Sequence, residues 1–155
     1  MIVNEDRLAG VHPALASMVK RAAANLGRDV IVIEGARTVG RQRELFAKGR
    51  TTEQLEAAGV NGVTGQPGEK KVTWTLKSKH LQQKDGYAHA VDLAPYDAGE
   101  IKWNDLAGFD AIALAMFWIA TAFGVRIRWG ADWDGDGKWR EKGESDSPHF
   151  ELAGE

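Results

Sequence analysis

The chain has 155 residues, 43% hydrophobic content, 27% charged content and a formal net charge of −2. These values predict one soluble globular domain with a sizeable core, and the lack of a basic surplus argues against a mainly electrostatic nucleic-acid binder. The sequence contains no cysteine, so disulfides and thiolate metal sites are excluded and any metal must be held by histidine and carboxylate.

Neither a signal peptide nor a membrane span is expected. Residues 1–7 lack the basic start and the apolar stretch of a secretory signal. The most apolar run, residues 111–125, is shorter than the about 20 residues that a bilayer requires. We therefore expect synthesis in the cytoplasm and no membrane insertion.

The first third of the chain predicts a helix, a strand and a second short helix. Pro13 suits a first helical turn, apolar residues recur every three or four positions up to Leu26, and Gly27 is a suitable stop. Residues 30–33 are typical of a buried strand, and Arg37 follows its end. The next helix contains Gln42 and ends near residue 49. Arg37 either holds a substrate oxygen with its planar set of donors or braces the turn.

In the middle of the chain, residues 52–58 predict a short helix. Val72, Trp74 and Leu76 then alternate with polar residues, which predicts a strand with one buried face that delivers Ser78 and His80. Residues 90–93 indicate the neighbouring strand, closed by Pro95.

The last third predicts a long core helix over residues 105–123, stopped by Gly124, because its apolar positions form a continuous stripe. Residues 125–129 and 148–152 predict two further strands. The chain shows no repeat, linker or low-complexity tract, which favours a single α+β domain over residues 1–155 with a small antiparallel sheet and helices packed on it.

Two stretches offer ligands for a divalent metal. His80 and Asp92 lie near the middle of the chain, and His149 lies near the end with Asp146 three residues before it. Catalytic zinc commonly takes three nitrogen and oxygen ligands and keeps a fourth position open, where a nearby carboxylate can remove a proton from water. We predict His80, Asp92 and His149 as metal ligands and Asp146 as the general base.

Three motifs carry a family resemblance. Ser78-Lys79-His80, Ala88-His89-Ala90-Val91-Asp92 and Asp146-Ser147-Pro148-His149 together resemble the D-Ala-D-Ala carboxypeptidase (VanY/VanX-like) superfamily of zinc peptidases, and within it the phage L-alanyl-D-glutamate endolysins. Ala88 replaces the usual glycine, and residues 82–87 lengthen the gap between His80 and Asp92 as a small insertion would.

The resemblance implies a Hedgehog/D-Ala-D-Ala-peptidase-like fold, zinc as cofactor, a catalytic role for Arg37, and a substrate contact by Gln42 on the helix beside it. It implies cleavage of the L-Ala–D-Glu bond of peptidoglycan stem peptides for host lysis, by a monomer that acts in the periplasm and has no separate wall-binding domain. Ser78 either positions substrate or braces the His80 loop. The alternatives are a D,D- or L,D-carboxypeptidase and a non-catalytic metal-dependent binding module.

Two other histidines need a role. His12 has no partner at ligand spacing and is expected on the surface. His89 lies three residues before Asp92, and strand alternation would turn the two to opposite sides. We therefore predict that His89 lies beside the metal ligands or contacts substrate rather than binding the metal.

A second acidic constellation lies between residues 132 and 144. Asp132, Asp134 and Asp136 are followed by Gly137, which matches the first half of an EF-hand calcium loop. The position where the loop should end in glutamate is Gly143, and Glu141 and Glu144 flank it. Some endolysins of the resembled family carry a comparable loop. The sequence therefore predicts either a solvated acidic turn or a Ca²⁺ site that orders Asp146 and His149.

Overall fold

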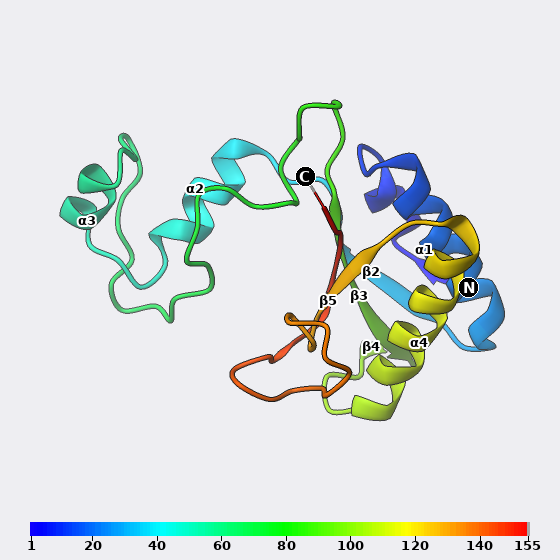
Figure 1. Ribbon diagram of the computed structural model, residues 1–155. Coiled ribbons are helices and arrows are strands. Elements are labelled where there is room, and N and C mark those ends of the chain that lie inside the picture. Colours follow the sequence, from blue (N-terminus) through cyan, green and yellow to red (C-terminus); the bar gives the residue numbers. More distant parts are fainter. Residues whose placement is uncertain (155) are drawn as a thin grey trace.

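A six-stranded sheet runs through the middle of the computed structural model, which describes residues 1–154 (Figure 1). The strands are β1 (Ile2–Val3), β2 (Val30–Glu34), β3 (Ala90–Asp97), β4 (Glu100–Ile101), β5 (Ile127–Gly130) and β6 (Asp146–Leu152). The helices are the 3-10 helix η1 (Glu5–Leu8) and the α-helices α1 (Pro13–Leu26), α2 (Val39–Ala47), α3 (Thr52–Ala57) and α4 (Leu106–Phe123). The predicted α+β class is confirmed.

The strand order is β1-β2-β3-β6-β5, with β4 paired to β3 outside this path. Only β1 and β2 run parallel, and the other pairs are antiparallel. Strand β3 is therefore central, with β2 on one side and β6 on the other. The β3–β6 register brings Asp92 directly opposite His149, although 57 residues separate them in the chain.

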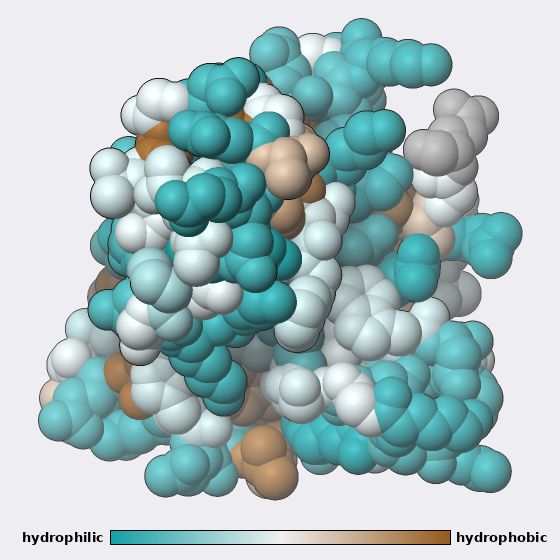
Figure 2. All heavy atoms as spheres, turned by 90° about the vertical axis from the view of Figure 1, so that its left-hand side faces the viewer, coloured by the Kyte–Doolittle hydropathy of each residue, from teal (hydrophilic) through white to brown (hydrophobic). Residues whose placement is uncertain are grey.

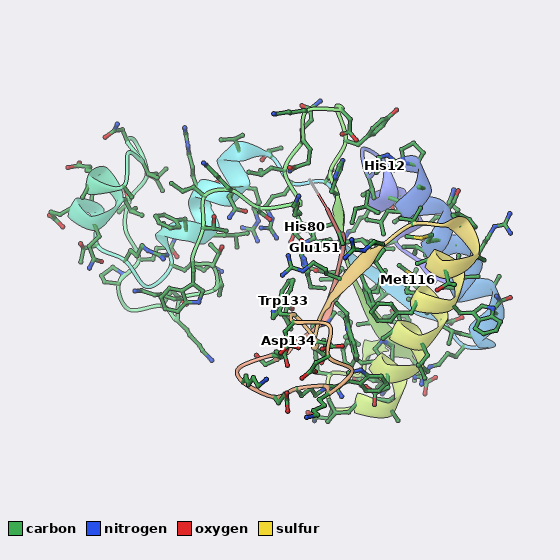
Figure 3. All side chains as sticks on the ribbon, viewed as in Figure 1. His12, His80, Met116, Trp133, Asp134 and Glu151 are labelled. Carbon is green, nitrogen blue, oxygen red and sulfur yellow. The ribbon has the colours of Figure 1, made fainter. Side chains whose placement is uncertain are left out.

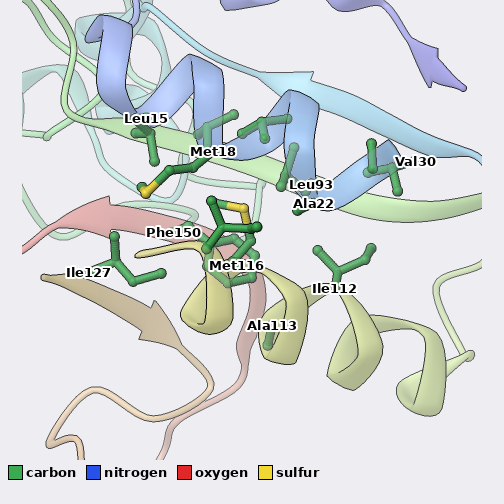
Figure 4. Close-up of a cluster of buried hydrophobic side chains, with 14 of the residues drawn as sticks. Leu15, Met18, Ala22, Val30, Leu93, Ile112, Ala113, Met116, Ile127 and Phe150 are labelled. Atoms are coloured by element: carbon green, nitrogen blue, oxygen red, sulfur yellow. The ribbon is translucent and has the colours of Figure 1, made fainter. Parts of the chain in front are cut away.

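Helices α1 and α4 cover one face of the sheet and form the core with it (Figures 1 and 4). The labelled side chains of Figure 4 come from both helices and from the strands, and include Met18, Met116 and Phe150. Both helices begin with a capping side chain and end at a glycine in the left-handed region, Gly27 with φ 65° and Gly124 with φ 68°. The two predicted long helices are thus confirmed.

Within residues 1–154, α4 is the one helix whose length and composition would also suit a membrane span. Here it packs against α1 and β3, and its inner side chains belong to the core, as predicted. Its outer side exposes Leu114 and Trp118, the latter to 78%.

Alternation along the strands separates the core from the polar side chains on the other face. In β3, Val91 and Leu93 belong to the core cluster, so Asp92 between them points away from it. In β6, Phe150 points into the core, whereas His149 and Glu151 flank it on the opposite face. The sheet therefore presents three ionisable side chains together on the face that α1 and α4 leave open.

A lobe built from α2, α3 and the chain up to residue 79 stands beside this open face (Figure 1). It has a small apolar cluster of its own, made of Phe46, Ala47, Leu55 and Val60. Figure 2 views the molecule from the side of this lobe and shows mostly hydrophilic side chains with scattered apolar ones. The lobe and the sheet form the two walls of the cleft described below.

The prediction of a strand over residues 72–77 is wrong. This segment has no strand, and Val72 and Trp74 are exposed to 56% and 77%. Threonine side chains bond the local backbone instead: the hydroxyl of Thr75 accepts from the amide of Lys77 at 2.9 Å. Such bonds two residues along the chain compete with a sheet ladder, so alternation alone was insufficient here.

Pro95 was predicted to close its strand, but β3 continues to Asp97. Strand β6 pairs with β3 only over Ala90–Asp92. The amide of Tyr96, which follows Pro95, points toward β2 and donates to the carbonyl of Asp29. The nitrogen of Pro95 therefore faces a side without a β6 partner, where the missing N–H breaks no ladder bond.

Candidate active site

His80, Asp92 and His149 meet on the open face of the sheet. Nε2 of His80 lies 3.3 Å from Oδ1 of Asp92, and Nδ1 of His149 lies 3.1 Å from the same oxygen. The three potential ligand atoms all lie within 4.8 Å of one another. Two imidazole nitrogens and a carboxylate oxygen at this spacing form a donor set that fits zinc and leaves a coordination position for solvent or substrate.

Each histidine is oriented by a bond to its other ring nitrogen. Nδ1 of His80 lies 2.8 Å from the carbonyl oxygen of Gly35, so it carries the proton and Nε2 is left facing Asp92. Nε2 of His149 lies 2.9 Å from Oε1 of Glu151, which leaves Nδ1 toward Asp92. Outer partners of this kind fix the tautomer and the ring orientation of metal-binding histidines.

The charges of the group are strongly coupled. Burial raises the pKa of Asp92, but hydrogen bonds with His149 and His80 outweigh it and hold that pKa well below its usual range. Burial lowers the pKa of His149, yet the bonds to Asp92 and Glu151 dominate and raise it to about 9. Without a metal, Asp92 and Glu151 therefore hold the protonated ring of His149 between them. A bound divalent ion would replace this positive charge.

His80 reaches this point from a loop, and three bonds fix it there. Its amide donates to Oγ of Ser78 at 3.2 Å, and its carbonyl accepts from the amide of Arg37 at 2.7 Å. Its ring bonds Gly35 as described above. Ser78 therefore braces the His80 loop, one of its two predicted roles, and it also lines the cleft.

The extra residues between His80 and Asp92 form a small hairpin outside the group. Gln82 and Ala88 form an antiparallel bridge, and the amide of Gln83 donates to the carbonyl of Tyr87 at 2.9 Å. The predicted insertion is accommodated there without separating the ligands.

Asp146 begins β6 and lies exposed in the cleft beside the group. Removal of its carboxyl group from water and the negative charge of Asp92 raise its pKa. The positive charges of His149, His80 and Arg37 lower that pKa by a smaller amount. A raised pKa makes a carboxylate a better proton acceptor. Its position depends on Gly130, where a Cβ atom would lie 2.2 Å from the carbonyl oxygen of Asp146.

Arg37 lies in the cleft but is already engaged. Its Nε and Nη2 donate to the two carboxylate oxygens of Glu34 at 2.6 and 2.5 Å, and its Nη1 donates to Oε1 of Gln42 at 2.5 Å. These bonds use three of the five N–H donors of the guanidinium. The carboxylate of Glu34 also offsets its charge, so Arg37 is an oriented donor rather than a free cation.

Gln42 and His89 are not positioned for the substrate contacts predicted for them. Gln42 is 1% exposed, and its amide donates to the carbonyl of Thr75 at 2.6 Å while accepting from Arg37. His89 bonds Asp85 at 2.7 Å and packs edge-on against His12, away from the cleft lining. Gln42 therefore holds Arg37 and the cleft wall in place, and His89 belongs to a separate cluster.

The cleft has a volume of about 660 Å³. Its lining includes the three metal-binding candidates, Asp146, Arg37 and Glu151 on the sheet side, and Trp74 on the lobe side. Figure 3 shows His80, Glu151 and Trp133 on the face of the sheet opposite Met116. The ring of Trp133 lies 5.3 Å from that of His149, so the acidic loop that carries Trp133 contacts the site directly.

The acidic loop between β5 and β6 gathers five carboxylates into two overlapping groups. Oxygens of Asp132, Asp134 and Asp136 lie within 4.8 Å of one another, and so do those of Asp134, Glu141 and Glu144. Glu144 is 5% exposed, and its Oε1 is buried without a hydrogen-bond partner among residues 1–154. A buried carboxylate oxygen without a partner is costly, and a bound cation would satisfy it.

The loop is connected to the strand that carries Asp146 and His149. Nε of Arg140 donates to Oγ of Ser147 at 3.1 Å, and its Nη2 donates to Asp110 of α4 at 2.7 Å. The indole of Trp129 donates to the carbonyl of Ser147 at 2.7 Å. The end of the acidic loop and the start of β6 are therefore held by the same contacts.

Glu34, Glu144 and Glu151 were missed as site residues in the sequence. Glu151 could have been found, because it lies two residues after His149 and strand alternation turns both to one face. Glu34 lies three residues before Arg37, but sequence spacing alone does not reveal the bidentate pair.

The fold and the site define a class: a small α+β protein with a His-Asp-His group and an adjacent carboxylate in an open cleft. A family model described as Phage L-alanyl-D-glutamate peptidase matches residues 61–153. The chain belongs to this family, which confirms the resemblance seen in the three motifs.

Individual proteins with L-Ala–D-Glu peptidase names are also similar to this chain. The chain is 31% identical over 153 residues to the L-alanyl-D-glutamate peptidase of Escherichia phage T5, covering 97% of this chain and 94% of that protein. It is 31% identical over 146 residues to the peptidoglycan L-alanyl-D-glutamate endopeptidase CwlK of Bacillus subtilis (strain 168), covering 92% and 73%. The crystal structure of the Serratia marcescens L-Ala D-Glu endopeptidase ChiX superposes with a TM-score of 0.64 at 28% identity, covering 99% of this chain and 90% of that one.

Proposed function

We propose that the protein is a zinc-dependent endopeptidase that cleaves the L-Ala–D-Glu bond of peptidoglycan stem peptides. The observation that carries this proposal is the group of His80, Asp92 and His149, with ligand atoms within 4.8 Å of one another, beside Asp146 in an open cleft. The names of the relatives from phage T5 and Bacillus subtilis supply the substrate bond.

In this proposal the two histidines and Asp92 hold zinc. When bound, the ion supplies a Lewis acid for the scissile carbonyl and for a water molecule. Glu151 and the carbonyl of Gly35 keep the imidazoles oriented toward it. With one anionic ligand, the site keeps a net positive charge that stabilises developing negative charge on the substrate.

Asp146 acts as the base. It accepts a proton from the attacking water and returns it to the departing amine of D-Glu, for which its raised pKa suits it. Arg37 orients the substrate with the N–H donors that Glu34 and Gln42 leave unused. An unpaired arginine would attract any anion. Because Glu34 offsets the charge of Arg37 and fixes its orientation, Arg37 favours a substrate carbonyl oxygen at one defined position.

We also propose that Ca²⁺ binds the acidic loop and regulates activity. Asp132, Asp134 and Asp136 supply oxygens in EF-hand order, and Glu144 supplies the carboxylate one residue later than the EF-hand pattern expects. Ordering this loop stabilises Trp133 against His149 and, through the contacts of Ser147, the position of Asp146.

Mass spectrometry of fragments released from purified Gram-negative peptidoglycan tests the proposal. We expect new L-Ala carboxyl ends and D-Glu amino ends that disappear with chelator and return with zinc. The variant His149→Ala should lose bound zinc and activity together, whereas His89→Ala, a histidine outside the cleft, should retain both.

Other outcomes separate the alternatives. Release of terminal D-Ala alone would keep the metal site but assign a carboxypeptidase. Metal-dependent binding to the wall without any cleavage, even with Ca²⁺ present, would assign a binding module. Full activity of His149→Ala would overturn the metal site itself.

A further inference from the structure

The lobe wall of the cleft presents an exposed tryptophan. Trp74 lines the same cleft as the metal-binding group, and 77% of the residue is open to solvent. A large aromatic side chain left in water forgoes the free energy of burial, so its exposure in a cleft suggests a ligand that covers it.

Trp74 is held in this position rather than carried on a loose chain. The carbonyl of Thr73, just before it, accepts from Nη1 of Arg50 at 3.1 Å. The carbonyl of Thr75, just after it, accepts from Nε2 of Gln42 at 2.6 Å. Arg50 is 9% exposed and Gln42 1% exposed, so two buried side chains anchor the backbone on both sides of the tryptophan.

Two cationic side chains lie close to the ring, and a third lines the same cleft. Nζ of Lys71 lies 4.8 Å from the ring centroid and the guanidinium carbon of Arg50 lies 5.9 Å from it. Lys77 lines the same cleft. An exposed aromatic face bordered by cationic donors suits a ligand that has an apolar C–H face and a rim of hydroxyl and carbonyl oxygens, which describes a sugar ring.

We propose that Trp74 forms a sugar subsite, on which the N-acetylmuramic acid ring of peptidoglycan stacks while the attached peptide is cut. The proposal rests on the proposed function. In peptidoglycan the amino group of L-Ala is joined to the lactyl group of this sugar, so the ring lies one residue from the scissile bond. A ligand bound across the cleft at the metal group would therefore bring its sugar to a wall of the same cleft.

The test compares two substrates on the native, metal-loaded protein. One is a muropeptide, N-acetylmuramyl-L-Ala-γ-D-Glu-diaminopimelate, and the other is the same tripeptide without the sugar. We expect Trp74→Ala to raise KM for the muropeptide about tenfold and to leave the sugar-free tripeptide unchanged, as loss of one aromatic stacking contact would. Trp74→Phe should restore most of the muropeptide affinity.

Trp118→Ala is the matched control, because Trp118 is 78% exposed on α4 and does not line the cleft. It should leave both substrates unchanged. An equal loss on both substrates with Trp74→Ala, or no loss on either, would overturn the sugar subsite. If the wild-type protein cleaves neither substrate, the proposed function fails first; cleavage with unchanged discrimination removes the subsite alone.

Discussion

The His-Asp-His group and the acidic loop both bring carboxylates together with their partners, but the two clusters are held in different ways. Asp92 and His149 are cross-strand partners in the sheet, and each imidazole has a fixed outer partner. The carboxylates of the acidic loop bond mainly to backbone amides of the loop itself, and the loop contains no helix or strand between β5 and β6.

This difference indicates that the His-Asp-His group is preorganised and the acidic loop is not. Asp92 and His149 lie on strands that the core fixes, and bonds to Ser78, Gly35 and Arg37 hold the His80 loop beside them, so the group should exist before any ion arrives. The acidic loop brings like charges together and leaves Oε1 of Glu144 buried without a partner, so its order should depend on a cation. Four variants break or sharpen this comparison.

The largest effect is expected at Asp146. Asp146→Asn removes the base but keeps the shape of the side chain, so kcat should fall by about 10²- to 10⁴-fold. Bound zinc should stay equimolar because Asp146 is not one of the three grouped ligands. Kinetics with a stem-peptide substrate and metal analysis of the same sample check this. Asp97→Asn, on an exposed carboxylate at the far end of β3, should change neither quantity.

The next effect is expected at Glu151. Glu151→Gln weakens the hold on the ring of His149, and zinc affinity should fall about 10- to 100-fold, as for other outer partners of metal-binding histidines. Competition with a chromogenic chelator measures it. Glu100→Gln, with a side chain 75% exposed, is the control. An unchanged zinc affinity would show that sheet position alone orients His149.

A smaller and separate effect is expected at Glu144. Glu144→Gln removes one charged ligand from the acidic loop and should weaken Ca²⁺ binding about tenfold. Zinc affinity should change far less, because the sheet register and the outer partners of the two histidines position the His-Asp-His group, and the loop touches it only through Trp133. Calorimetric titration with each metal makes the comparison, and Glu56→Gln on the exposed side of α3 is the control. Parallel losses of both metals would mean that the two sites fold as one unit.

The smallest effect is expected at Lys142. Its ammonium lies 3.4 Å from Asp134, 3.9 Å from Asp136 and 3.3 Å from Glu141, where it partly neutralises the loop. Lys142→Met removes this internal competitor, so Ca²⁺ affinity should rise about two- to fivefold at low salt, the size of exposed ion pairs. Lys138→Met in the same loop should have no such effect, and a fall in affinity with Lys142→Met would contradict the competition.

Much of the fold could be predicted from periodicity. The two long helices have regular apolar stripes and glycine stops, and both were found with nearly the observed bounds. The strand predicted around Trp74 does not form, because threonine side chains bond the local backbone there and alternation alone cannot reveal this. Propensity does not show which face of a segment will have a partner.

The candidate site was predictable only in part. Residue spacing suggested the individual ligands, and the family resemblance grouped them into one site. The same resemblance predicted a substrate contact for Gln42, whose side chain is buried. Gln42 was misassigned because its side-chain amide is already bonded to two protein partners, Arg37 five residues before it and Thr75, which is 33 residues away in the chain. The sequence showed Glu141 and Glu144 on either side of Gly143 without indicating which of them turns into the loop, and the burial of Glu144 depends on three-dimensional packing.

The cross-strand pairing of Asp92 with His149 has a consequence for how the molecule folds. A slip of β6 by one residue would turn His149 and Glu151 toward the core and Phe150 toward the cleft. The two chain segments would then be paired but unable to bind the ion. If zinc binds as proposed, the acquisition of tight zinc binding during refolding would report the correct register between Asp92 and His149, which are 57 residues apart in the chain.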